Sequence, residues 1–213
     1  QLSKHVNQKK KKKISLIQNK ALELSMFLSV PASVALVIGS EQIISALFGY
    51  GSFIENSVIN SSNALYYFGL GLPAFALIKV FSTFFFANHD TKTPFYISLV
   101  SVLLNILISV YFFKDIGFII IPIATTISSW FNSLILFIYL KNNNLFEFNK
   151  TFFKQFVKII FASIMMGIFF QYLILFFENQ LSYTYFFKSA YLLLCVLFTI
   201  IFYFAVSYFI KAF

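Results

Sequence analysis

The sequence contains no arginine, and its single cysteine, Cys195, lies in an apolar run. One thiol cannot form an internal disulfide, so a disulfide scaffold is excluded. Charged residues make up only 11% of the 213 residues, whereas soluble domains usually carry about a quarter. Hydrophobic residues make up 60% of the chain. A soluble core cannot enclose that much apolar surface, so the composition predicts an integral membrane protein.

Residues for catalysis or metal binding are equally scarce. The two histidines, His5 and His89, fall in polar segments, and the seven acidic residues are scattered. There is no glycine-rich phosphate loop and no nucleophile elbow. We therefore expect no enzyme activity, no metal and no cofactor. The run Lys9 to Lys13 lacks the aromatic residues and the soluble domain that nucleic-acid binding would need, so it is interpreted as a signal of topology that also attracts anionic membrane lipids.

Six runs are long enough to cross about 30 Å of hydrocarbon as helices. They cover residues 21–40, 63–87, 95–113, 117–140, 159–177 and 186–210. The fifth run would begin near Thr151 if Lys154 and Lys158 extend to the membrane surface. The predicted fold class is thus all-α, a polytopic bundle of six transmembrane helices.

The lysines orient these spans, because short loops rich in lysine face the cytoplasm. Thirteen of the 16 lysines fall on the side that holds both chain ends, two (Lys114 and Lys188) on the other side, and Lys79 within a span. We expect both ends to be cytoplasmic. The first residue is Gln rather than Met, and no signal peptide is recognisable, so we expect a piece of a longer protein.

The sequence divides into four parts: a lysine-rich cytoplasmic segment (1–20), four spans (21–140), an amphipathic cytoplasmic linker at the membrane surface (141–158) and two C-terminal spans (159–213). In the polar loop after the first span, Ile43, Ile44, Leu47 and Phe48 recur at helical spacing. This spacing predicts a short surface helix ending near Gly49.

Polar residues recur along one side of the spans, as in Ser25, Ser29 and Ser33. Such stripes indicate faces turned away from lipid, either for helix packing or for a substrate cavity. Periodicity does not separate the two. Asn105 and Asn132 are the better cavity candidates, because an amide has more hydrogen-bonding sites to satisfy than a hydroxyl.

Lys79 lies eight residues inside the stretch that ends at Ala87, about 12 Å along a helix. An intramembrane cation usually faces the bundle interior or water. Lys79 therefore contacts an anionic substrate group or a coupling ion, or else it extends to the surface or bonds a neighbouring helix. Ser82 and Thr83 share its helix face. Pro73, six residues earlier, is expected to kink the helix.

The stretch from Gly71 to Pro94 reads GLPAFALIKVFSTFFFANHDTKTP and resembles a signature of the MurJ/MviN family of lipid II flippases. The shared positions include Pro73, Lys79 and the loop Asp90, Thr91, Lys92, Thr93 and Pro94. Pro31-Ala32, Asn105-Ile106 and the Ala124 to Asn132 segment agree in order, so the resemblance covers about residues 2–140. The last two spans match only as hydrophobic helices.

The resemblance implies one part of a transporter in the multidrug/oligosaccharidyl-lipid/polysaccharide exporter superfamily, which has two six-helix lobes, followed in MurJ by two more helices. This chain would carry spans nine to fourteen and would need the missing N-terminal lobe as its partner. The family's cationic cavity for lipid II is attributed mainly to arginines in earlier spans, and this chain has none. The last two helices would form the groove for the lipid tail.

The predicted function is flipping of the lipid-linked peptidoglycan precursor lipid II from the inner to the outer leaflet by alternating access. Two alternatives stay open. One is export of another lipid-linked oligosaccharide or of drugs within the same superfamily, against which the Asp-Thr-Lys-Thr-Pro loop argues. The other is a membrane scaffold half without transport activity of its own.

Overall fold

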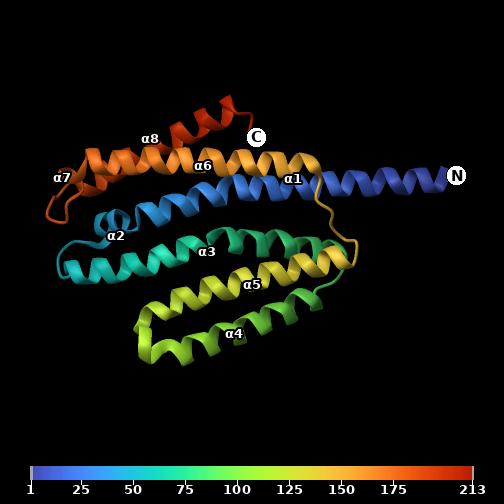
Figure 1. Cartoon of the computed structure of the whole chain (residues 1–213), viewed down its shortest axis with the longest axis horizontal. Coiled ribbons are helices and arrows are strands. Elements are labelled where there is room, and N and C mark those ends of the chain that lie inside the picture. The colour runs from blue at the N-terminus through green and yellow to red at the C-terminus, as the bar shows by residue number, and fades with distance from the viewer. Residues whose placement is uncertain (1, 213) are drawn as a thin grey trace.

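The computed structural model of the chain describes the backbone of residues 2–212 and the side chains of residues 13–149 and 151–212. Every element in this part of the chain is a helix, which confirms the predicted all-α class (Figure 1). The elements are α1 (Leu2–Ile38), α2 (Ser40–Phe48), α3 (Glu55–Ala87), α4 (Lys92–Ile116), the 3-10 turn η1 (Gly117–Ile119), α5 (Ile120–Asn142), α6 (Lys150–Phe176), α7 (Glu178–Leu181) and α8 (Lys188–Phe209).

Five helical stretches of the described residues are long and apolar enough to cross a membrane: Lys13–Ile38, Glu55–Ala87, Lys92–Asn142, Thr151–Phe176 and Lys188–Phe209. The third is 51 residues long and contains both α4 and α5. The two helices reverse direction at η1, where Gly117 adopts a φ of 74° that other residues rarely take. The count is five rather than six because η1 continues the helical stretch from α4 into α5 without a break, although Lys114 and Asp115 lie just before the reversal.

The long helices lie in a row rather than in a closed bundle, in the order α4, α5, α3, α1, α6 and α8 (Figure 1). Helix α3 packs against α5 on one side and α1 on the other, and α6 joins α8 to the row through α1. The accessible surface is 13591 Å², whereas a soluble monomer of this mass exposes about 10,000 Å². The excess is the apolar surface that a row leaves uncovered on its two faces.

Several predicted boundaries differ from the structure. Helix α1 includes the lysine-rich segment, and α3 begins at Glu55 rather than at 63. Helix α6 begins at Lys150, next to the earlier predicted start at Thr151 rather than at 159. Polar residues can continue a helix beyond the apolar layer, so the hydrophobic run underestimates its length. At α6, the Asn149 side chain caps the start by accepting a hydrogen bond from the Thr151 amide. The predicted short helix is confirmed as α2, and it ends at Gly49.

The predicted linker 141–158 is a short loop plus the last turn of α5 and the first turns of α6, and part of it packs inside the protein. Phe146 and Phe152 are buried against Phe81 and Phe84 of α3. A membrane-surface helix would turn its aromatic residues to lipid, but only Phe153 and Phe148 of this segment stay largely exposed. The loop thus closes the end of the row where α3 ends and α6 begins.

Two buried amides of α1 hold this loop in place. Gln18 Nε2 donates to the Leu145 carbonyl at 3.1 Å, and Asn19 Nδ2 donates to the Glu147 carbonyl at 2.8 Å. Asn19 Oδ1 in turn accepts from the Asn149 amide at 3.0 Å. Both residues fall in the segment predicted as a cytoplasmic tail. Their hydrogen bonds connect α1 to the loop between α5 and α6.

Pro73 lies inside α3, which continues through it to Ala87. A proline has no N–H, so the carbonyl four residues earlier, that of Gly69, loses its helical donor. Ser33 of α1 replaces the donor, because its hydroxyl donates to Gly69 O at 2.7 Å. A kink at Pro73 stays a prediction, whereas the replacement hydrogen bond is present.

Helix α5 supplies two more donors to the same stretch of α3. Thr126 Oγ1 donates to the Tyr67 carbonyl at 2.6 Å, and Trp130 Nε1 donates to the Leu70 carbonyl at 3.1 Å. Helices α3 and α5 approach each other closely at Gly71, since a Cβ there would lie 2.8 Å from Thr126 Oγ1. We call Ser33, Thr126 and Trp130 the α3 clamp. Side chains that satisfy carbonyls next to a proline are what allow prolines within membrane helices.

The Ser33 bond is tested by a double-mutant cycle with Pro73. Ser33→Ala should lower the free energy of unfolding of the full-length protein by about 1 kcal/mol, because Gly69 O is left unpaired. In a Pro73→Ala background the restored N–H can bond Gly69 O, so Ser33→Ala should then cost little. Ser29→Ala is the matched control, since the buried Ser29 hydroxyl has no partner among the described residues. Equal costs of Ser33→Ala in both backgrounds would contradict the role.

Candidate functional site

Lys79 lies on an exposed face of α3 and has no hydrogen bond or ion pair among the described residues. Thr83, one turn later, is also exposed, and its hydroxyl donates to the Val80 carbonyl of its own helix at 2.6 Å. Ser82 is half-buried at the edge of this face. Phe75 and Phe86 flank the face and are also exposed. The Lys79 face of α3 is therefore a cation and a hydroxyl surrounded by aromatic rings.

The two asparagines lie elsewhere, in the contact between α4 and α5. Asn105 Nδ2 donates to Thr125 Oγ1 at 3.0 Å and to Ser128 Oγ at 3.3 Å. Asn132 Nδ2 donates to Ser98 Oγ at 3.3 Å. These contacts tie the two helices together, which is the packing interpretation of the polar stripes. Asn132 Oδ1 is buried without a partner among the described residues.

The structure thus does not join all the candidate residues in one site. Lys79, Ser82 and Thr83 share α3, whereas Asn105 and Asn132 bond within the α4–α5 pair, and α4 barely touches α3. A cavity role for any of them stays a prediction, and for Asn105 the packing role is visible.

The predicted loop Asp90 to Pro94 lies only partly in the connection between α3 and α4, because Lys92, Thr93 and Pro94 already form the first turn of α4. The Asp90 amide donates to the Phe85 carbonyl at 3.1 Å and the His89 amide to the Phe86 carbonyl at 3.0 Å, with His89 at a φ of 60°. This is the Schellman pattern that ends a helix. Asp90 Oδ1 then accepts from the Thr93 amide at 3.0 Å, at the start of α4. These hydrogen bonds with Thr93, from its amide first and then its side chain, lower the pKa of the Asp90 carboxyl.

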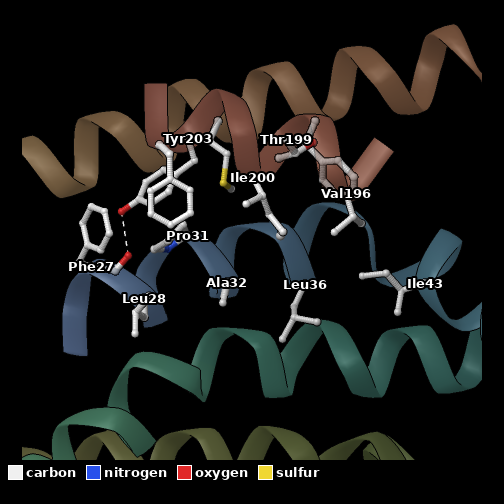
Figure 2. Close-up of a pocket in the computed structure, with 14 residues that line it drawn as sticks. Phe27, Leu28, Pro31, Ala32, Leu36, Ile43, Val196, Thr199, Ile200 and Tyr203 are labelled. Atoms are coloured by element: carbon white, nitrogen blue, oxygen red, sulfur yellow. Dashed lines mark hydrogen bonds between the residues drawn. The ribbon is translucent and has the colours of Figure 1, made fainter. Parts of the chain in front are cut away.

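An apolar groove of about 470 Å³ lies between α1 and α8, with α6 as its floor (Figure 2). Pro31 and Ala35 line it from α1, Met166 from α6, and Ile200 and Tyr203 from α8. Its two side-chain hydroxyls are already engaged, because Thr199 donates to the Cys195 carbonyl and Tyr203 to the Phe27 carbonyl. The groove can therefore hold a hydrocarbon chain but offers no free polar group to a head group.

The polar stripe of α8 faces the inside of the protein. Cys195, Thr199, Tyr203 and Ser207 are all buried, at most 4% exposed. Their four-residue spacing predicts a face turned away from lipid, and burial confirms it. The stripe contributes to helix packing, and Tyr203 closes one end of the groove by packing against Phe27, with the two rings tilted and their centroids 5.1 Å apart.

The sequence analysis missed one buried cation. Lys188 was counted only as one of two lysines on the outer side, but it is 1% exposed at the first residue of α8. Its ammonium donates to the carbonyls of Gly49 and Tyr183. Counting lysines per loop shows the side of the membrane on which a loop lies but not which side chain folds inward, so nothing in the pattern distinguishes Lys188 from Lys114.

The fold and the groove define a multi-pass membrane protein. A family profile described as "Lipid II flippase MurJ" matches residues 1–212. The chain therefore belongs to the MurJ family of lipid II flippases, which are transporters rather than enzymes. The resemblance seen in the sequence, which covered about residues 2–140, is confirmed over nearly the whole chain.

Individual relatives agree. A probable lipid II flippase MurJ of Rhizobium meliloti (strain 1021) is 39% identical over 121 residues, which are 57% of this chain and 23% of the relative. That of Buchnera aphidicola subsp. Baizongia pistaciae is 32% identical over 179 residues, 84% of this chain and 34% of the relative. The solved structure "Lipid II flippase MurJ, inward closed conformation" is 26% identical with a TM-score of 0.75 and matches 94% of this chain and 40% of its own. The chain thus spans about a quarter to a third of these curated relatives.

The hydrogen bond from the Thr93 amide to the Asp90 carboxylate gives a prediction about pH. Because the folded pKa is lowered, the carboxylate stabilises the fold above the ordinary Asp pKa and loses this contribution as the pH falls through the folded pKa. Asp90→Ala should lower the melting temperature by a few degrees at most at neutral pH, and the loss should vanish in acid. Asp90→Asn should retain most of the stability, since its amide oxygen still accepts from Thr93.

The measurement is thermal unfolding of the full-length protein in detergent between about pH 3 and pH 7. A melting-temperature difference between wild type and Asp90→Ala that does not change over this range would show that the charged carboxylate contributes nothing.

Proposed function

We propose that this chain forms the C-terminal part, spans nine to fourteen, of a flippase that moves lipid II from the inner to the outer leaflet by alternating access. Membership of the MurJ family supports the substrate class. The observation in the chain that carries the proposal is Lys79, which is exposed within α3, eight residues before its end at Ala87, without a partner among the described residues.

An unpartnered lysine inside a membrane helix is costly when lipid covers it, by several kcal/mol at the bilayer centre. Water or protein is therefore the expected neighbour of the Lys79 face. A second lobe packed across a water-filled cavity meets this need, and it matches the two-lobe architecture implied for the family. In that arrangement Lys79 approaches the anionic pyrophosphate of the substrate, and Ser82 and Thr83 supply hydroxyls beside it.

The proposed topology has six spans, with α4 and α5 as two separate crossings and both chain ends in the cytoplasm of a bacterial inner membrane. The lysine distribution supports it, with 13 lysines on the side of the chain ends and two on the other. The antiparallel course of α4 and α5 also supports it (Figure 1). With this orientation α2 and α7 lie at the outer surface, and the loop held by Gln18 and Asn19 lies at the inner one.

The groove between α1 and α8 is the proposed site of the polyprenyl tail. Its lining is apolar, and it extends along α1 from Phe27 to Leu36, about 14 Å. A tail held there stays in the hydrophobic layer while the head group crosses through the polar interior. This division of the lipid between two sites gives α6 and α8 a role in transport.

Two other functions predict different results in cells. Depletion of the lipid II flippase should leave lipid-linked peptidoglycan precursor on the inner leaflet, whereas loss of an exporter of another glycolipid or of drugs should leave cell-wall synthesis intact. A scaffold half without transport activity should be replaceable by a variant that folds but does not transport.

Lys79 is tested by substitution in the full-length protein. Lys79→Ala should lower the lipid II that reaches the outer leaflet by about tenfold or more, because a charge-assisted contact to the pyrophosphate is lost. Lys79→Arg keeps the charge and should retain part of the activity. Lys114→Ala, at the exposed last turn of α4, is the matched control. Normal flipping by Lys79→Ala would rule out the proposed contact.

The groove is tested by photo-crosslinking. A benzophenone amino acid in place of Ile200 should label a polyprenyl diphosphate lipid in membranes, because Ile200 lines the groove. The same residue in place of Leu193, which is exposed on α8 outside the groove, should label bulk phospholipid but little polyprenyl lipid. Equal polyprenyl labelling at both positions would argue against a tail site.

A further inference from the structure

The buried Lys188 lies between two chain segments that are far apart in sequence. Its ammonium donates to the Gly49 carbonyl and to the Tyr183 carbonyl, each at 2.6 Å. The rings of Tyr50 and Tyr183 lie 4.4 Å and 4.6 Å from the same nitrogen. A single cation thus joins the end of α2 to the loop before α8.

The neighbouring polar groups bridge the same two segments. Ser189 Oγ donates to the Ala46 carbonyl at 2.6 Å and lies 2.6 Å from the Tyr50 hydroxyl. The Tyr183 hydroxyl donates to the Phe53 carbonyl at 2.7 Å. We call Lys188, Tyr50, Tyr183 and Ser189 the Lys188 cluster.

The chemistry suits a buried cation. Gly49 caps the C-terminus of α2, where unpaired carbonyls give a helix its negative end. Aromatic faces add attraction for an ammonium that water does not reach. There is also no room for another side chain, because a Cβ at Gly49 would lie 3.0 Å from the Lys188 ammonium and 2.5 Å from the Ser45 carbonyl.

The cluster lies at one end of the apolar groove. Helix α8 packs against α6 along its length but faces α1 only across the groove. At the far end, the Tyr203 hydroxyl bonds the Phe27 carbonyl and ties α8 to α1 (Figure 2). At the near end, next to Ile43, the tie is the Lys188 cluster, through α2.

We propose that Lys188 is a positioning residue that sets the width of the groove at its α2 end. The ammonium holds the first turn of α8 on α2; without it, this end of α8 keeps the Ser189 bond to Ala46 and the apolar cluster that contains Ala46 and Leu192 but loses its buried cation. The consequence for lipid tails rests on the proposed function, whereas the position of α8 does not.

The test compares two distances in the full-length protein, reconstituted without substrate in a cysteine-free background. Spin labels at Asn63 of α3 and Leu193 of α8, both exposed, report the α2 end of the row. Labels at Phe86 and Tyr208, also exposed, report the other end. Lys188→Met should shift or broaden the first distance distribution by about 2 Å or more, the scale of a helix displacement, and should leave the second unchanged. Lys114→Met, the matched control, should change neither.

Two milder variants cover the case in which Lys188→Met does not fold. Tyr50→Leu removes a ring and a hydroxyl from a residue that is 39% exposed, and it should give the same displacement in weaker form. Tyr50→Phe keeps the ring and should give less. Unchanged distances at the α2 end in Lys188→Met, or in Tyr50→Leu where Lys188→Met does not fold, would overturn the inference, and so would equal changes at both ends.

A second readout separates this inference from the proposed function. Undecaprenyl phosphate, titrated into the same samples, should bind Lys188→Met about fivefold or more weakly than wild type or Lys114→Met. Wild-type protein that takes up no undecaprenyl phosphate would count against the tail site alone, and the distances would still decide the role of Lys188.

Discussion

Helix α3 depends on its neighbours at the point where Pro73 removes a backbone donor. A membrane interior supplies no water to the freed carbonyl, so the donor has to come from another helix. Ser33 on α1 provides that donor to the Gly69 carbonyl. From the other side, Thr126 and Trp130 on α5 bond the neighbouring Tyr67 and Leu70 carbonyls. Because α3 is the centre of the row, these bonds fix the order α5, α3, α1 on which every other contact is built.

The last two long helices are attached to the row mainly near their ends. Helices α6 and α8 join the row through α1 and are secured at the two ends by polar side chains that reach backbone carbonyls. Gln18 and Asn19 hold the loop before α6, and Lys188 holds the loop before α8. Between these ends the α1–α8 contact is left open as the groove. Polar bonds at the ends and apolar surface in the middle allow a hydrocarbon to enter without breaking the fold.

Much of this architecture follows from hydrophobic length and periodicity. The all-α class, the short helix α2 and the buried stripe of α8 were all predicted, because a span needs a certain length and a buried face repeats every three to four residues. The helix start at Glu55 was missed, and the start of α6 at Lys150 agrees with only one of the two predicted positions, Thr151, since polar residues continue a helix outside the apolar layer. The arrangement of the helices in a row rather than a bundle was also missed. A polar stripe shows that a helix face is buried, but it does not show which helix packs against that face.

The candidate site was harder to predict for the same reason. Asn105 is a cavity candidate by its chemistry, yet Thr125 and Ser128 of the facing helix satisfy its amide. Only the pairing of α4 with α5 reveals those partners. Lys188 is the opposite case, a lysine that was counted only on the outer side and that tertiary structure buries beneath two tyrosines and two carbonyls.

Lys188 and Lys79 differ in whether the described residues supply their partners. Lys188 has every partner that a buried ammonium requires, and all of them come from the described residues, so its role is internal to this part of the protein. Lys79 has no partner among those residues, although it lies within an apolar helix where an unsatisfied charge is costly. The same physical rule that explains the burial of Lys188 is the reason for proposing a neighbour beyond the row for the Lys79 face. A facing lobe and an anionic substrate are the two partners that the proposed transport cycle supplies.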